Sequence, residues 1–264
     1  MPLYVNVPID NPKYHNQTEL VNDDEIFKHA FDFKTPGFIV KLYRFFCFII
    51  FLGPIRFICT LLAWFLHFII LSILPLFKRF FKTHREFTDF GHILSAPVLR
   101  LLLLSIGIVR IKINGKYDRE ARTVVANHTT MVDAPLMFYV LPVQFLAMAG
   151  LKSNPYFSKG ASAFGAIFVD RSKAEGVTAQ IRKAQDATDE IPVGIFPEGR
   201  VTNGSCLLGF RNGAFINNTP LQPMSFRYRH WLIPESMATI SWVEWNIFTY
   251  LYQMYSVPFY TVEV

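Results

Sequence analysis

The sequence predicts an α/β domain whose mostly parallel sheet is flanked by helices, preceded by an N-terminal membrane helix or re-entrant hairpin. Two observations carry this prediction. From about residue 108 onward short apolar segments alternate with helical ones, and the segment 37–77 is nearly all apolar. Strands that alternate with helices typically form a parallel sheet covered by helices. The expected strands are Val109–Ile113, Thr123–Ala126, Val143–Met148, Ala166–Val169, Val193–Phe196 and Leu221–Phe226.

The chain divides by composition into three expected parts. Residues 1–36 are polar and are expected to form an arm on the surface. Residues 37–93 are expected to form a membrane-embedded helical segment with a basic flank. Residues 94–264 are expected to form the α/β domain, in which the clearest helix is Ser172–Glu190 because its first residues favour a helix start.

The composition favours contact with lipid. Hydrophobic residues make up 52% of the chain and charged residues only 17%, against about 25% in ordinary soluble domains. The formal net charge of +6 fits an anionic membrane, an anionic substrate or nucleic acid. The densest basic group directly follows the apolar segment, as in a juxtamembrane flank. This group comprises Lys78, Arg79, Lys82 and Arg85. Nucleic acid is therefore not expected as a partner.

The apolar segment allows two arrangements. The stretch Phe57–Phe77 is long enough to span a bilayer, which needs about 20 apolar residues, and the pair Gly53-Pro54 breaks the helix before it. Either one helix spans the membrane after Pro54, or two half-helices form a hairpin that enters and returns. Basic residues at both ends favour the hairpin, with both ends on the cytosolic side. The run 94–109, which Arg100 interrupts, predicts an amphipathic helix on the membrane or on the domain.

Cysteine usage and glycosylation signals favour a cytosolic catalytic domain. Cys47, Cys59 and Cys206 do not make a disulfide framework. The sequon at Asn127 falls within the candidate site described next, where a glycan would block chemistry.

A histidine and an aspartate five positions apart form the main candidate for chemistry. His128 and Asp133 follow the expected strand Thr123–Ala126. Five helical positions separate two side chains by about 140°, so they meet only if His128 lies in the turn and Asp133 in the first helical turn. A histidine whose one ring nitrogen is held by a carboxylate keeps its other nitrogen free to take a proton. The alternative is a structural histidine at a turn, with Asp133 as a helix N-cap.

A second candidate loop follows the strand Val193–Phe196. The sequence Pro197-Glu198-Gly199-Arg200 ends the strand in a tight loop. Backbone N–H groups near a glycine approach anions closely, and an arginine fork suits phosphate. The alternative is an ordinary turn at the end of a strand.

Taken together, four blocks in order resemble the glycerolipid acyltransferase family with its His-x4-Asp motif. The chain is most similar to the lysophosphatidylcholine acyltransferase branch of that family, over essentially its whole length. The blocks are Asn127 to Asp133, Gly165 to Arg171, Phe196 to Gly199, and Pro220-Leu221-Gln222-Pro223. The resemblance implies a glycerolipid acyltransferase-like fold for the α/β domain.

The resemblance also implies roles for single residues. His128 would be the general base and Asp133 its orienting partner. Arg171, Glu198, Gly199 and Arg200 would bind the phosphate or glycerol part of the acceptor, and Pro223 would line the acyl or acceptor pocket. Without the resemblance, Arg171 is a surface charge after a strand and Pro223 a bulge or edge-strand proline.

The implied activity is transfer of a fatty acyl group from acyl-CoA to the hydroxyl of a lysophospholipid, with a lysophosphatidylcholine-like acceptor favoured. This implies acyl-CoA as co-substrate, no cofactor, no metal, and an endoplasmic reticulum or related membrane with the domain facing the cytosol. Alternatives are transfer to glycerol-3-phosphate or lysophosphatidate, a CoA-independent transacylase, and a catalytically impaired membrane protein of the same fold. Two departures bear on the choice. Arg200 stands where the family usually has Thr, and the family chain usually continues beyond Val264, often with calcium-binding helices.

Overall fold

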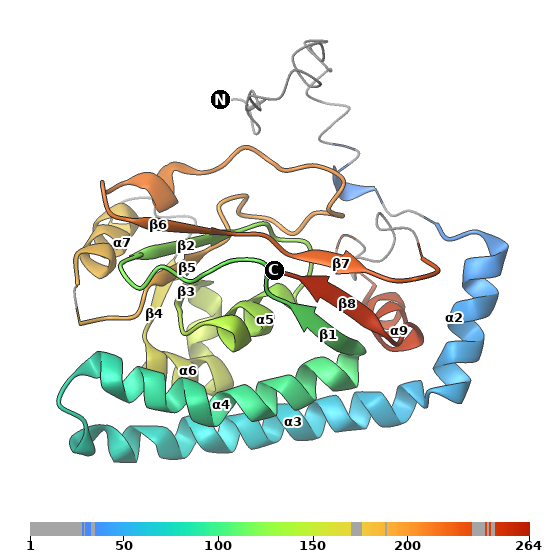
Figure 1. Cartoon of the computed structure of the whole chain (residues 1–264), viewed down its shortest axis with the longest axis horizontal. Coiled ribbons are helices and arrows are strands. Elements are labelled where there is room, and N and C mark those ends of the chain that lie inside the picture. Colours follow the sequence, from blue (N-terminus) through green and yellow to red (C-terminus); the bar gives the residue numbers. More distant parts are fainter. Residues whose placement is uncertain are drawn as a thin grey trace, which may run out of the picture.

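A computed structural model describes residues 28, 30–32, 35–169, 176–187, 189–233, 241, 243 and 246–264 (Figure 1). Most of the polar arm predicted for residues 1–36 lies outside the described residues. The end of that arm contacts the α/β domain, where Asn203 donates from its backbone N–H to the carbonyl of Ala30 at 2.8 Å. Its side-chain amide also donates to the carbonyl of Asp32 at 3.0 Å.

A five-stranded parallel sheet forms the centre of the domain and confirms the predicted fold class. Its spatial order is β4-β3-β5-β2-β6. The strands are β2 (Thr123–Ala126), β3 (Gln144–Met148), β4 (Ala166–Val169), β5 (Val193–Ile195) and β6 (Leu221–Met224). The helices associated with the sheet are α5 (Asp133–Val140), α6 (Pro155–Phe164) and α7 (Val177–Asp186), with the short 3-10 helices η2 (Ala149–Ser153) and η3 (Asn212–Phe215). All four residues of β2 are buried, as expected of a strand covered on both faces.

A second, smaller sheet was not predicted from the sequence. It has the order β1-β8-β7, with β1 (Ile108–Lys112) parallel to β8 (Tyr260–Glu263) and β7 (Arg227–Arg229) antiparallel to β8. One strand prediction was therefore wrong in part. The first predicted strand joins this small sheet, and the predicted strand Leu221–Phe226 ends at Met224 because the chain then crosses from one sheet to the other.

The helices before the sheet are arranged differently from the predicted hairpin. They are α2 (Phe38–Ile50), α3 (Gly53–Ile73), the 3-10 helix η1 (Leu74–Phe80) and α4 (His84–Ile106), and α9 (Ile247–Ser256) lies beside α2. The helices on either side of Gly53-Pro54 do not fold back on each other. Instead α3 and α4 lie side by side along one edge of the molecule, and α2 turns away from α3 toward α9 (Figure 1).

Local geometry explains where the helices break. Leu52 has a φ of 54°, which turns the chain between α2 and α3. A Cβ on Gly53 would lie 2.4 Å from the ring of Phe48, so only glycine allows this close approach. Pro54 lies in the first turn of α3, where its missing N–H has no helical acceptor to lose. Gly53-Pro54 therefore starts a helix and does not close a hairpin.

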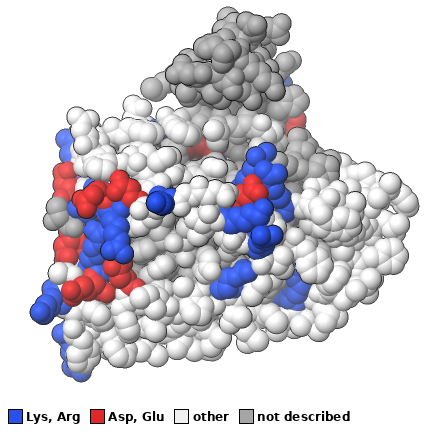
Figure 2. All heavy atoms as spheres, in the orientation of Figure 1, with Lys and Arg blue, Asp and Glu red and all other residues white. Residues whose placement is uncertain are grey.

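The outer sides of these helices form a continuous apolar surface. Segments Gly53–Phe80 and His84–Ile106 are long and apolar enough to cross a membrane by length and composition. The other face of α4 contacts α5, α6 and β1, which confirms a helix packed on the domain. Figure 2 shows almost no charge along the right side and most of the lower edge of the molecule, where α2 and α3 lie in Figure 1. The most exposed of the large apolar side chains there include Phe38, Ile39, Ile50, Phe65, Leu76 and Phe80.

Candidate active site

The turn after β2 is fixed to the crossing between the two sheets. The side-chain oxygen of Asn127 accepts from the backbone N–H of Phe226 at 2.7 Å, and its amide group donates to the carbonyl of the same residue at 3.0 Å. This pair of hydrogen bonds places the next residue, His128, at the carboxyl edge of the parallel sheet, where α/β folds form their sites.

His128 and Asp133 meet as the sequence predicts. Nδ1–H of His128 donates to Oδ2 of Asp133 at 3.1 Å. Asp133 is the first residue of α5, and His128 lies in the turn before that helix. In the neutral imidazole whose Nδ1–H donates to this carboxylate, Nε2 carries the lone pair, and no hydrogen bond to Nε2 is formed by the described residues. The His128 side chain is 17% exposed and that of Asp133 is fully buried.

The buried carboxylate of Asp133 is surrounded by donors. Its Oδ2 also accepts from the backbone N–H groups of Thr129 at 2.6 Å and Thr130 at 2.8 Å. Its Oδ1 accepts from the hydroxyl of Tyr228 at 2.5 Å. A buried charge is costly unless hydrogen bonds compensate it, and here four donors do so. Burial, and next the charge of Asp133, raise the pKa of Tyr228 well above its ordinary value, so this hydroxyl keeps its proton.

The imidazole lies flat against an aromatic ring. The ring centroids of His128 and Phe196 are 4.0 Å apart, with an interplanar angle of 14°. Phe196 follows β5, the direct neighbour of β2 in the sheet. The stacking fixes the plane of the imidazole and, together with the bond to Asp133, defines the direction in which Nε2 points.

The Pro197-Glu198-Gly199 loop supports the turn that carries His128. Oε1 of Glu198 accepts from the backbone N–H of His128 at 2.8 Å, and Oε2 accepts from that of Leu208 at 3.1 Å. Glu198 is buried, and this burial raises the pKa of its carboxyl group, although the two N–H donors oppose the rise. Both oxygens are thus directed at backbone groups, so the side chain supports the turn that carries His128. The predicted role of Glu198 in binding the acceptor stays a prediction.

Gly199 is required by the shape of this loop. Its φ is +68°, and a Cβ there would lie 2.7 Å from Nε of Arg211. The next residue, Arg200, is exposed. The predicted role of these residues in binding an acceptor phosphate stays a prediction.

Two other residues were predicted to take part in binding the acceptor. Arg171 lies outside the described residues. Pro223 is exposed in β6, where it pairs with Val125 of β2. Because β6 is an edge strand of the sheet, a proline is tolerated there without a functional reason. The role of Pro223 in lining a pocket stays a prediction.

Tyr228 and Phe196 are the site residues that sequence reasoning did not single out. Tyr228 lies between two exposed arginines, Arg227 and Arg229. Alternation of this kind in a strand turns the middle side chain to the opposite face, and this signal was available in the sequence. That Tyr228 reaches Asp133 depends on its pairing with β8, some thirty residues later.

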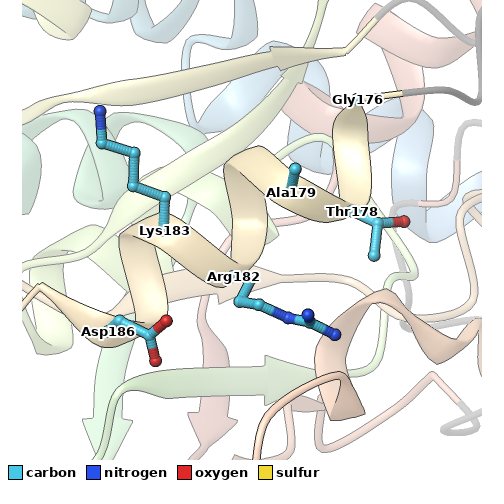
Figure 3. A pocket seen from close by; sticks show the side chains of 6 residues that line it. All are labelled: Gly176, Thr178, Ala179, Arg182, Lys183 and Asp186. Carbon is cyan, nitrogen blue, oxygen red and sulfur yellow. The ribbon is translucent and has the colours of Figure 1, made fainter.

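A shallow hollow lies away from the dyad, on α7 (Figure 3). Its lining comes from Gly176, Thr178, Ala179, Arg182, Lys183 and Asp186. Arg182 and Lys183 extend from opposite sides of the helix in Figure 3, so they do not converge on one point. No group of three or more His, Cys, Asp or Glu side chains among the described residues is arranged to hold a metal ion.

The chain matches a known protein family over the segment that contains the dyad. Residues 92–227, just over half of the chain, match the Acyltransferase family. The chain belongs to this family. The matched segment contains β2, the His128–Asp133 turn and the Glu198 loop, and it ends one residue before Tyr228.

Several curated relatives are acyltransferases of lipids. The chain is 33% identical over 164 residues to lysophospholipid acyltransferase LPEAT2 of Arabidopsis thaliana, covering 60% of this chain and 29% of the relative. It is 31% identical over 155 residues to lysophosphatidylcholine acyltransferase 1 of Danio rerio, covering 55% and 28%. It is 28% identical over 132 residues to lyso-ornithine lipid O-acyltransferase of Pseudomonas aeruginosa, covering 48% and 51%. The matches thus span between about a quarter and half of the length of these relatives.

A solved structure is also similar. It is the 1-acyl-sn-glycerophosphate acyltransferase PlsC from Thermotoga maritima, which matches with a TM-score of 0.48 at 18% identity. The match covers 66% of this chain and 76% of that one.

Proposed function

We propose that this chain is a membrane-bound acyltransferase that moves a fatty acyl group from acyl-CoA to the hydroxyl of a lysophospholipid. The observation that carries the proposal is the pairing of His128 Nδ1 with the buried Asp133 carboxylate, which leaves Nε2 available as a base. Membership of the Acyltransferase family supports acyl transfer, and the names of the relatives support a lysophospholipid acceptor.

The reaction is a direct transfer. The acceptor hydroxyl gives its proton to Nε2 of His128 while its oxygen attacks the thioester carbonyl. The C–S bond then breaks, and the CoA thiolate takes the proton back from the imidazolium. The products are an ester and free CoA, and this balance requires no cofactor. Positioned base catalysis of this kind typically contributes 10²–10⁴-fold.

The surrounding residues act by holding the base. Asp133 supports the positive charge that forms on the imidazole, and Phe196 and Glu198 fix its plane and its backbone. Following the family resemblance, we expect Arg171, Gly199 and Arg200 to bind the phosphate or glycerol part of the acceptor, and Pro223 to line its pocket. These assignments are part of the proposal.

We propose that the protein associates with the membrane through α2, α3 and the outer face of α4. One face of α4 contacts α5, α6 and β1 of the domain, which supports an arrangement in which α4 does not cross the bilayer. Its partner α3 lies beside it, so both helices are expected to lie along the membrane surface with their apolar faces in the lipid. The basic residues Lys78 and Arg79, at the end of η1, then stay at the level of the headgroups on the same side as the domain. An endoplasmic reticulum or related membrane, with the domain in the cytosol, fits this arrangement.

Acyl transfer by the purified full chain tests the proposal. Radiolabelled acyl-CoA is offered with lysophosphatidylcholine, lysophosphatidylethanolamine, lysophosphatidylglycerol, lysophosphatidate or glycerol-3-phosphate. We expect transfer to at least one lysophospholipid, with the strongest rate for the choline acceptor. His128→Ala should lower that rate by about 10²–10⁴-fold without weakening vesicle binding. Transfer to none of the acceptors, or a variant that keeps more than about a tenth of the rate, contradicts the proposal.

A further inference from the structure

The β1-β8-β7 sheet has an apolar inner face and a basic outer face. Residues that pair across neighbouring strands point to the same side of a sheet. On the inner face Ile111, Val262 and Tyr228 are aligned by this pairing, and Val262 and Tyr228 are fully buried or nearly so. The outer face carries two cross-strand rows. These rows are Arg110–Thr261–Arg229 and Lys112–Glu263–Arg227.

A β-bulge directs the first strand's basic residues outward. Ile108 pairs with Tyr260 and Arg110 pairs with Thr261, so one extra residue, Val109, is inserted between them. Without this insertion, Ile108 and Arg110 would share a face because side chains alternate with period two. Arg100 of α4 stabilises the bulge by donating to the carbonyls of Ile108 at 2.8 Å and Val109 at 2.7 Å. The bulge buries Ile108 and places Arg110 in solvent.

The outer face has an excess of positive charge. The two rows hold four cations and one carboxylate, that of Glu263. Its oxygens lie 2.7 Å from Nε of Arg229 and 3.5 Å from Nζ of Lys112. The side chains of these two cations are nevertheless 46% and 42% exposed. Figure 2 shows a compact blue group around a small red area at the place of β1, β7 and β8 in Figure 1.

This basic face borders the apolar helix surface. Gly107 alone separates α4 from β1, and the neighbouring side chains Val109 and Ile113 are 41% and 58% exposed. Phe259 directly precedes β8. Its ring contacts the ring of Phe51, at the corner between α2 and α3, with centroids 4.9 Å apart. A basic patch next to an apolar surface is the arrangement that attracts anionic lipids.

We propose that the outer face of the β1-β8-β7 sheet binds the headgroups of anionic phospholipids in the membrane that the apolar helices enter. This inference rests on the membrane association in the proposed function. The outer rows lie on the surface of an open sheet, so they fit an extended layer of headgroups better than one soluble phosphate. The inner face of the same sheet carries Tyr228, whose hydroxyl donates to Asp133. Contact between headgroups and the outer face therefore sets the orientation of the dyad relative to the membrane.

Binding of the full chain to vesicles tests this role separately from catalysis. Vesicles of phosphatidylcholine are compared with vesicles that also contain phosphatidylserine, at low and high salt. The double variant Arg110→Gln, Lys112→Gln changes only the edge strand β1 and leaves β7 intact. Each cation near an anionic surface contributes about fivefold to affinity, so the variant should bind the anionic vesicles about 30-fold more weakly at low salt. Its binding to neutral vesicles should not change.

A matched control removes two cations elsewhere. Arg182→Gln, Lys183→Gln changes two exposed residues of α7 and should keep the preference for anionic vesicles. The inference is overturned if the β1 variant keeps this preference, or if its only defect is a higher KM for acyl-CoA, which would assign the face to a soluble phosphate. A chain that binds both vesicle types equally overturns the inference but not the proposed acyl transfer, which the acceptor panel measures independently.

Discussion

Replacing Asp133 by Asn isolates the charge of the dyad from its geometry. Oδ2 of Asp133 faces three N–H donors, from Thr129, Thr130 and His128, whereas Oδ1 faces one hydroxyl, that of Tyr228. The amide of the variant has one oxygen, which must take the position of Oδ2 because an NH₂ group there would oppose three donors. The NH₂ group then faces Tyr228, whose hydroxyl turns to accept. His128 therefore keeps its tautomer and its orientation, and only the negative charge is lost.

The expected loss of rate follows from that charge. The two groups are 3.1 Å apart, and a pair of unit charges about 4 Å apart contributes about 4 kcal/mol at an effective dielectric constant of 20. Each 1.4 kcal/mol corresponds to tenfold in rate, so kcat should fall about 10³-fold. KM should not change, because Asp133 is buried and does not reach substrate. Initial rates of acyl transfer measure both quantities, with Asp118→Asn, a change at an exposed aspartate, as the control.

The double variant decides whether the two residues act as one unit. If Asp133 works only through His128, the combination His128→Ala, Asp133→Asn should be no slower than His128→Ala alone. A further loss of tenfold or more in the double variant would show an independent role for Asp133. A single variant Asp133→Asn with more than about a tenth of the normal rate would refute the electrostatic argument itself.

Three further changes test the surroundings of the dyad. Tyr228→Phe removes one donor to Asp133. A hydrogen bond to a charged group contributes about 1.5–3 kcal/mol, and part of this energy stabilises the transition state, so kcat should fall about tenfold. Tyr252→Phe is the control, and a Tyr228→Phe variant as fast as the unmodified chain contradicts the expectation. Gly199→Ala places a Cβ 2.7 Å from Nε of Arg211 at a residue whose φ is +68°. The free energy of unfolding, measured by denaturant titration, should therefore fall by about 1–3 kcal/mol. Gly150→Ala, where a Cβ meets open space, is the control. Burial raises the pKa of Glu198, so the folded state binds that proton more tightly than the unfolded state does. The free energy of unfolding should therefore fall as the pH rises from about 4.3, the ordinary value, through the raised folded value, and Glu198→Gln should remove this decline; a decline that persists in the variant contradicts the assignment.

The dyad was predictable because its geometry is local. A strand, a turn and the first residue of a helix lie within eleven residues, from Thr123 to Asp133, and the separation of five allows only one arrangement in which the side chains meet. The strands of the parallel sheet were predictable for a similar reason. Each is a short apolar run, and four of them differ from the prediction by no more than one residue at either end.

The arrangement of distant segments was not predictable from these patterns. The sequence of α3 shows that the helix is apolar. It does not show that α3 lies along α4 rather than along α2. The crossing at Ser225 depends on the pairing of β7 with β8, which a single apolar run does not reveal. Arg100 interrupts an apolar run for a reason that lies outside the helix, because it binds the carbonyls of the bulge. In each case the deciding partner is far away in the sequence or belongs to another element.

The register of one short strand determines both faces of the small sheet. Side chains alternate along β7, so a slip by one residue would exchange its two faces. Tyr228 would then leave Asp133, and an arginine would be buried in its place, close to the dyad. The pairing of Arg229 with Thr261 and its ion pair with Glu263 at 2.7 Å oppose such a slip. Because the same register sets the hydrogen bond to Asp133 and the basic outer face, a change that weakens headgroup contact without shifting β7 should leave the dyad intact, whereas a change that shifts β7 should damage both.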